Sequence, residues 1–151
     1  MASAAVVSAI EGAIGTIVNG TRQWTSGVTG DVLPVLGLND SADKRPTNGA
    51  PFIVLEYPVS NEQWLTVGAP GANIFKEIGG FRIILSEKRT VGMARAYGWI
   101  DELRTLFRGI TFLSGALQCF ESPPSVINNN SDLGNYFEFS FVVPYRYYLQ
   151  G

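Results

Sequence analysis

The sequence predicts an α+β domain, a mostly antiparallel sheet of about four to five strands with two helices packed on one face. Two segments, residues 3–18 and 90–109, repeat apolar side chains every three or four positions, which is typical of amphipathic helices. Others, at 51–59, 74–88 and 135–148, alternate β-branched and aromatic residues with polar ones, which indicates strands. Short connections between neighbouring strands favour antiparallel hairpins.

The first helix is expected to begin at Ser3, a residue type favoured at N-caps, and to run to Val18. Its apolar stripe consists of Val7, Ile10, Ile14 and Ile17. Residues 19–50 are expected to form a long irregular loop, because glycine, proline and polar residues recur along them. A loop of this length within a single domain, here residues 1–151, is usually functional or disordered.

The second helix is expected from Thr90 to a stop at Gly109, where glycine suits the position after a helix end. Its core stripe consists of Met93, Ala96, Ile100, Leu103 and Phe107. In the preceding strand, the pair Gly79–Gly80 predicts a bulge or a bend. A short strand at 115–123 and a loop at 123–134 are expected to follow the helix.

The last strand, NYFEFSFVVPYRYY, places Phe137, Phe139 and Phe141 on one side, and we expect that side to face the core. Pro144 has no amide hydrogen to donate, so the second half of the strand is expected to be an edge, a bulge or a bend. Beyond it, Tyr145, Tyr147 and Tyr148 combine large rings with polar tips. They suit either a surface covered by a partner or the rim of the core.

The composition favours a subunit of an assembly. Charged residues make up 16% of the chain, against roughly 25% in an average soluble domain. The mean hydropathy is +0.13. Part of the surface is therefore expected to be covered by other subunits, and the alternative is a surface rich in Ser, Asn and Thr. The net charge of −2, with scattered basic residues, argues against tight nucleic-acid binding.

The residue types argue against catalysis and against a bound cofactor or metal. Histidine is absent, which removes the commonest general base and metal ligand. Cys119, the one cysteine, is interpreted as a buried thiol. The glycine-rich stretch at 68–73 precedes a strand and lacks the Lys-Ser/Thr of a phosphate loop. Asp40 and Asp43 have the chemistry for a divalent ion, but the signal is weak, because loops favour Asp for turn formation.

No segment has the roughly 18 apolar residues that a membrane span needs, and the first residues lack the basic region of a signal peptide. Charged residues of the second helix form either an ordinary solvated face or a polar rim between subunits. Trp64 is the preferred aromatic contact anchor. The candidate interface residues are Trp64, Arg95, Asp101, Glu102, Arg104, Tyr145, Tyr147 and Tyr148, and the candidate docking or channel-lining residues are Asp40, Asp43, Lys44, Arg45, Asn129 and Asp132.

Several short signatures recur in one order over most of the chain. They are the opening helix ending at Ile14–Val18, the proline-containing loop around Trp24, PFIVLEYPV after an Asn-Gly, IGGFRIIL, WIDELRTLF and the closing VVPYRYY. This layout resembles the tail terminator and tail-completion proteins of long-tailed bacteriophages.

The resemblance implies a structural, non-enzymatic virion protein of the tail or neck, assembled in the cytoplasm of the host bacterium. It implies a homo-hexameric ring that caps the tail tube, stops its polymerisation and joins the tail to the head. The implied partners are the tail tube protein and the head–tail connector protein, with no membrane. DNA would pass through the channel without specific binding. The alternatives are another neck or tail-tube component, a minor structural or adhesion module outside phage tails, or a small-molecule-binding or enzymatic α+β domain.

Overall fold

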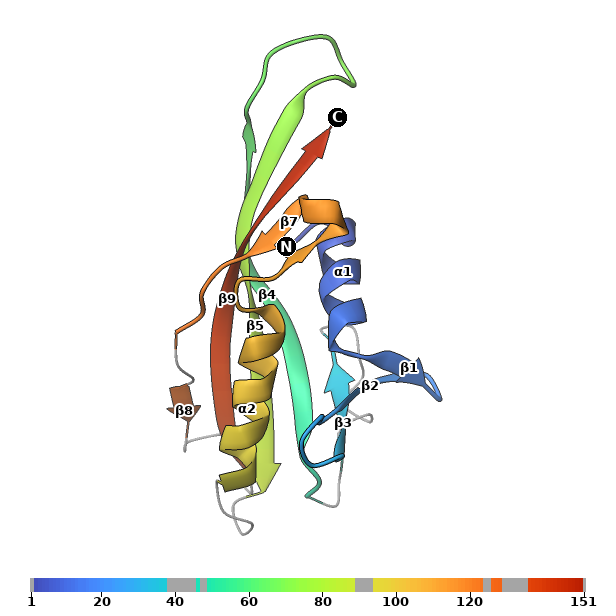
Figure 1. Cartoon of the computed structure of the whole chain (residues 1–151), viewed down its shortest axis with the longest axis vertical. Coiled ribbons are helices and arrows are strands. Elements are labelled where there is room, and N and C mark those ends of the chain that lie inside the picture. Colours follow the sequence, from blue (N-terminus) through green and yellow to red (C-terminus); the bar gives the residue numbers. More distant parts are fainter. Residues whose placement is uncertain are drawn as a thin grey trace.

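The computed structural model describes residues 2–37, 46, 49–88, 94–123, 126–128 and 136–150. Along the chain its elements are α1 (Ala4–Ile14), β1 (Thr16–Val18), β2 (Thr21–Thr25), β3 (Val32–Leu36), β4 (Phe52–Trp64), β5 (Ile74–Lys88), α2 (Ala94–Phe107), β6 (Thr111–Phe112), the short 3-10 helix η3 (Leu113–Gly115), β7 (Leu117–Cys119), β8 (Val126–Asn128) and β9 (Tyr136–Gln150). The helices lie on one face of a long sheet, and β4, β5 and β9 continue beyond them (Figure 1).

The sheet is mixed and larger than the sequence predicts. Its strands follow the order β1-β2-β3-β4-β5-β9-β7-β6, and β8 pairs with β9 outside this path. Every pairing is antiparallel except that of β3 with β4. The prediction of about four to five strands is wrong, because the described residues form a sheet of nine. The broad α+β class holds, with two α-helices beside the sheet.

Two of the unpredicted strands, β2 and β3, lie in the segment expected to be an irregular loop. Each has five residues, and β3 contains Pro34, so local composition argues against both. Pairing within the fold overrides that composition: Val35 of β3 lies opposite Arg22 of β2 and Ile53 of β4. The burial of Leu33 and Val35 in the core adds to the stability of the pairing.

The first helix is shorter than predicted, because α1 ends at Ile14 and the chain turns into β1. Gly15 makes this turn possible: a Cβ there would overlap the carbonyl oxygen of Gln23. Ile10 and Ile14 are buried as predicted, whereas Ile17 lies on β1 with its side chain 63% exposed. The helix therefore ends where the backbone at Gly15 runs close beside β2.

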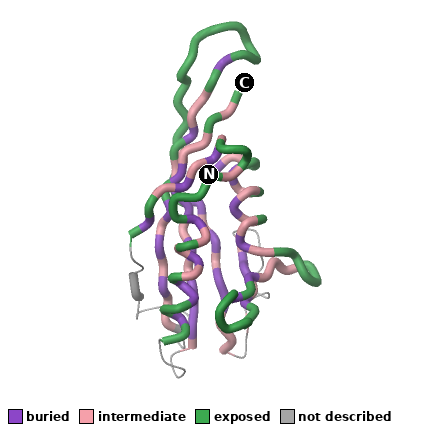
Figure 2. Tube along the Cα trace, in the orientation of Figure 1, coloured by how far each residue is buried: buried purple, intermediate pink, exposed green. Residues whose placement is uncertain are grey.

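The core lies between the helices and the sheet, and most of the predicted core positions are in it (Figure 2). Phe139 and Phe141 are buried as expected, and Phe137 packs partly against them. Phe81 and Phe107 meet edge to face, with ring centroids 4.9 Å apart. The predicted residues of α2 that the structure describes are all buried, namely Ala96, Ile100, Leu103 and Phe107. Met93 lies outside the described residues.

In one row of paired residues, the three long strands β4, β5 and β9 each depart from regular strand structure or composition. We call this row the crease. The pairing of β4 with β5 shifts between Glu56 and Val59, so the bulge lies in β4 and not at the glycine pair. Val59 lies opposite Gly80, which in turn lies opposite Pro144 of β9. A bulge, a glycine and a proline thus stand side by side, and each permits a bend.

Candidate interaction surface

Beyond the crease the sheet forms a projection, which we call the arm: residues 60–64 of β4, 74–79 of β5, 145–150 of β9 and the connection 65–73 (Figure 1). In the body the helices cover one sheet face, but they do not reach along the arm, whose connection is exposed (Figure 2). Exposed apolar side chains gather on the arm and at its base: Val59, Trp64, Leu65, Val67, Ile74, Ile78 and Tyr148.

The arm face that continues the core-facing side of the sheet is aromatic at its tip. The register aligns Trp64 with Phe75 and Phe75 with Leu149. The rings of Trp64 and Phe75 are stacked, with centroids 5.8 Å apart and planes inclined by 23°. Trp64 nevertheless keeps 59% of its surface exposed. A large aromatic side chain, held in place by a neighbouring ring and still open to solvent, is suited to anchor a protein contact.

The opposite face of the arm carries positive charge. One row holds Lys76 beside Tyr148, and the next holds Ile78 beside Arg146. The guanidinium of Arg146 lies 5.3 Å from the ring centroids of both Phe120 and Tyr148, and donates to Gln118 Oε1 at 2.7 Å. Within the described chain, neither Lys76 nor Arg146 forms an ion pair with a carboxylate. This face therefore combines two cations with exposed apolar side chains.

A buried carboxylate ties the base of the arm to the body. Glu77 is 5% exposed, and its carboxylate accepts the Ser3 amide hydrogen at 3.1 Å and the Tyr145 hydroxyl at 2.9 Å. Burial, followed by the hydrogen bond to Glu77, raises the pKa of Tyr145. Ser3 immediately precedes α1, so this cluster joins the first helix to β5 and β9. Glu77 is the main structural position of the arm that the sequence did not indicate.

The predicted tyrosine anchors occupy different environments. Tyr145 is 1% exposed, so its prediction as a surface anchor is corrected: it is a core residue bound to Glu77. Tyr147 packs partly against the core, and Tyr148 is 37% exposed on the arm. Trp64 and Tyr148 are therefore the predicted aromatic anchors that the arm presents to solvent.

The charged residues predicted on the second helix interact mainly within the chain. Arg95 donates to Glu87 Oε2 at 2.7 Å, and this bond is the main cause that raises the Arg95 pKa. Glu102 accepts the Ser26 hydroxyl at 2.6 Å and the Gly27 amide hydrogen at 3.0 Å. These bonds join α2 to β5 and to the turn after β2.

The remaining two predicted helix charges, Arg104 and Asp101, pair with each other on α2, and Arg104 is the less exposed of the two. Arg104 donates to Asp101 Oδ1 at 3.4 Å and to the Ser122 carbonyl at 3.2 Å. Asp101 keeps 71% of its side chain exposed. The predicted docking or channel residues lie outside the described residues: Asp40, Asp43, Lys44, Arg45, Asn129 and Asp132.

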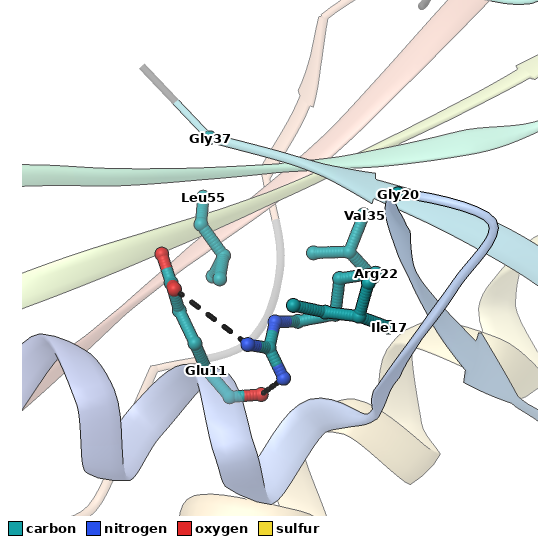
Figure 3. Close-up of a pocket in the computed structure, with 7 residues that line it drawn as sticks. All are labelled: Glu11, Ile17, Gly20, Arg22, Val35, Gly37 and Leu55. Atoms are coloured by element: carbon teal, nitrogen blue, oxygen red, sulfur yellow. Dashed lines mark hydrogen bonds and ion pairs between the residues drawn. The ribbon is translucent and has the colours of Figure 1, made fainter. Parts of the chain in front are cut away.

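A small cavity of about 160 Å³ lies between α1, the β1–β2 hairpin and the sheet (Figure 3). Arg22 lines it, but its guanidinium donates to the carbonyls of Glu11 at 2.9 Å and Gly15 at 2.6 Å. The Glu11 carboxylate lies 4.0 Å away. The charge of Arg22 therefore stabilises the carboxyl end of α1, where the helix dipole is negative. This engagement argues against Arg22 as a ligand-binding cation.

Among the described residues there is no group of three or more Cys, Asp or Glu side chains arranged to hold a metal ion. No helix in the described part of the chain is long and apolar enough to cross a membrane. No family model and no curated protein matches this chain. The arm therefore stands as the candidate site on its geometry and chemistry.

The sequence contains a partial indication of the arm. Between Ile74 and Ile78 both phases of the strand contain apolar residues, since Phe75 alternates with Ile74. Such a segment is expected to have two covered faces. In the structure Ile74 and Ile78 lie exposed on the outer face of this segment, whereas Phe75 on the other face is half-buried, and the exposed pair points to a partner.

Proposed function

We propose that this protein is a structural component of a bacteriophage virion, a tail terminator that assembles as a hexameric ring. The ring caps the tail tube, stops its polymerisation and joins the tail to the head–tail connector protein. The proposal combines the family resemblance of the sequence with one structural observation: the arm carries apolar side chains on both faces and projects beyond the helices. Exposed apolar surface of this kind is characteristic of interfaces that form on assembly.

The proposed mechanism is steric and requires no chemical step. A ring with one face complementary to the tube accepts the last tube ring, and its other face, which differs, offers no site for another. Each subunit therefore contributes shape and apolar contact area rather than reactive groups. The absence of histidine from the sequence and its low fraction of charged residues support a protein that works through contacts.

The direct test measures the assembly state and the capping of tubes. Size-exclusion chromatography with light scattering is expected to give a species of six subunits, and negative-stain images are expected to show rings with a central hole. Added to purified tail tubes, the protein is expected to bind one end and to block further elongation. A species that stays monomeric at all concentrations and leaves tube growth unchanged would refute the proposal.

A further inference from the structure

The solvent-facing side of α2 contains a groove that the proposed function does not yet use. It has a volume of about 710 Å³ and lies where α2 approaches β6. Leu106, Ile110 and Phe112 supply apolar lining, and Ile110 is 42% exposed. The charged residues of its lining, Asp101 and Glu102, are both acidic. The groove is thus apolar with a negative rim.

Asp101 is the acidic residue of this rim whose charge is available to pair with a cation of another copy. Its carboxylate pairs with Arg104 at 3.4 Å, but the Asp101 side chain is 71% exposed. An exposed ion pair of this kind contributes roughly 0–1 kcal/mol, so it offers little resistance to a new partner. Glu102, in contrast, is held by Ser26 and Gly27. Asp101 is therefore the acidic group best placed to meet an incoming cation.

The arm has the complementary properties on the same chain. The arm protrudes from the molecule, whereas the groove is recessed. The outer face of the arm carries the cations Lys76 and Arg146, whereas the groove carries acidic residues. Ile78 and Tyr148, both partly exposed, supply apolar contacts beside those cations. Pairing two arms by their outer faces would set like charges against each other. Charge complementarity therefore favours contact between the arm and the groove of another copy.

We propose that the outer face of the arm of one copy seats on the α2 groove of the next copy, with Lys76 opposite Asp101. The contact uses two different patches of one chain, so it is heterologous, and its repetition closes into a ring when the rotation permits. This inference rests on the proposed ring, and it identifies the surfaces that join neighbouring subunits.

Disulfide trapping provides a direct test, because the chain has a single native cysteine. Cys119 is 1% exposed, and burial raises the pKa of its thiol to about 12, so it does not compete in the oxidation. Ile78→Cys and Thr105→Cys are prepared separately and mixed, then oxidised. We expect a covalent dimer from the mixture, since Thr105 lines the groove. Ile78→Cys mixed with Val28→Cys is the matched control and is expected to stay uncrosslinked.

The outcomes separate this inference from the proposed function. Rings that form without a crosslink between positions 78 and 105, or a crosslink in Ile78→Cys alone, would overturn the arm–groove contact while leaving the ring intact. Failure of the unmodified protein to oligomerise would overturn both. Melting temperatures of the cysteine variants near that of the parent chain would show that the fold is kept.

Charge reversal gives an independent readout that needs no disulfide. Lys76→Glu and Asp101→Lys are each expected to weaken subunit association about tenfold, since each places like charges together. A chain carrying both substitutions is expected to regain most of the lost affinity. Equal association of all three variants, or additive loss in the double variant, would contradict the proposed pairing.

Discussion

At the scale of single residues, several polar side chains that the sequence suggests as interface residues instead hold the fold together. Glu87 is fully buried, and Arg95 reaches it from α2 while its guanidinium lies 5.0 Å above the ring of Trp99. Tyr145 similarly satisfies the buried Glu77. A buried carboxylate deprived of its partner is costly, so these residues are constrained by stability.

Replacing Arg95 with methionine is expected to destabilise the protein by about 3 kcal/mol, because Glu87 would keep a buried and unpaired charge. Arg82→Met is the matched control, since Arg82 pairs with Glu56 at 3.4 Å and both side chains are partly exposed. Its expected cost is below about 1 kcal/mol. Urea unfolding measures both variants, and equal losses would contradict the structural role of Arg95.

The buried hydroxyl of Tyr145 is also expected to make the stability of the protein depend on pH in the alkaline range. Its pKa is raised in the folded state above the value of about 10 expected when unfolded. The resulting stabilisation is complete below about pH 10 and is lost progressively as the pH rises from there toward the higher folded-state pKa, because the unfolded chain releases the proton more readily. Tyr57 and Cys119, whose pKa values are also raised by burial, contribute in the same direction.

Between about pH 9 and pH 11, the free energy of unfolding of the parent protein is therefore expected to fall more than that of Tyr145→Phe. At neutral pH the variant is expected to be about 1–3 kcal/mol less stable, because the hydrogen bond to Glu77 is lost. Urea titrations at both pH values measure this difference. Parallel pH profiles for the two proteins would show that the Tyr145 hydroxyl contributes nothing to it.

At the scale of elements, the crease decides how three long strands are divided between body and arm. A bulge in β4, Gly80 in β5 and Pro144 in β9 lie side by side. Gly79, in the next row, is crowded: a Cβ there would overlap the Val59 carbonyl and lie 2.7 Å from the Tyr145 hydroxyl. The glycine therefore allows close passage of the strands and leaves room for the Tyr145–Glu77 bond.

Gly79→Ala is accordingly expected to destabilise the protein by about 1–3 kcal/mol through overpacking. Gly12→Ala on α1 is the control, since a Cβ at that position meets no atom within 4 Å. It is expected to stabilise the helix by about 0.5–1 kcal/mol. Thermal or urea unfolding distinguishes the expected destabilisation by Gly79→Ala from the expected stabilisation by Gly12→Ala. Equal stability of Gly79→Ala and the parent would show that the crease tolerates a side chain.

At the scale of the whole molecule, the arm exposes more apolar surface than folding of one chain explains. Val67 at its tip is 91% exposed, and Val28, on the turn between β2 and β3, is 82% exposed. The two positions therefore allow the same substitution to be compared at similar exposure. Val67 lies on the arm, whereas Val28 lies outside it.

Val67→Asp is expected to weaken assembly, with an increase of about tenfold in the subunit dissociation constant, because a charge would be desolvated at the interface. Val28→Asp is expected to assemble like the parent. Sedimentation or light scattering over a concentration series measures both, and circular dichroism checks that each is folded. Equal loss in the two variants would indicate a general surface effect and would contradict a role for the arm tip.

The sequence by itself determined the elements whose stability is local. The 3.6-residue stripe of α2 and the long alternation of β5 and β9 are visible in the residues, because each element has enough positions to show its period. Trp64 and Tyr148 are predicted as contact residues because they are large aromatic side chains in polar surroundings, and both are exposed. The absence of histidine was likewise a property of composition alone.

Tertiary structure alone decided the rest. β2 and β3 are strands because neighbours pair with them, and α1 ends at Ile14 because β2 passes close by. Whether an aromatic or charged residue is a surface group or a structural one depends on its neighbours in the fold. Tyr145 is hydrogen-bonded to Glu77, and Arg95 is hydrogen-bonded to Glu87. Contacts between residues distant in sequence carry no local period, so neither these roles nor the arm–body division follows from the residues alone.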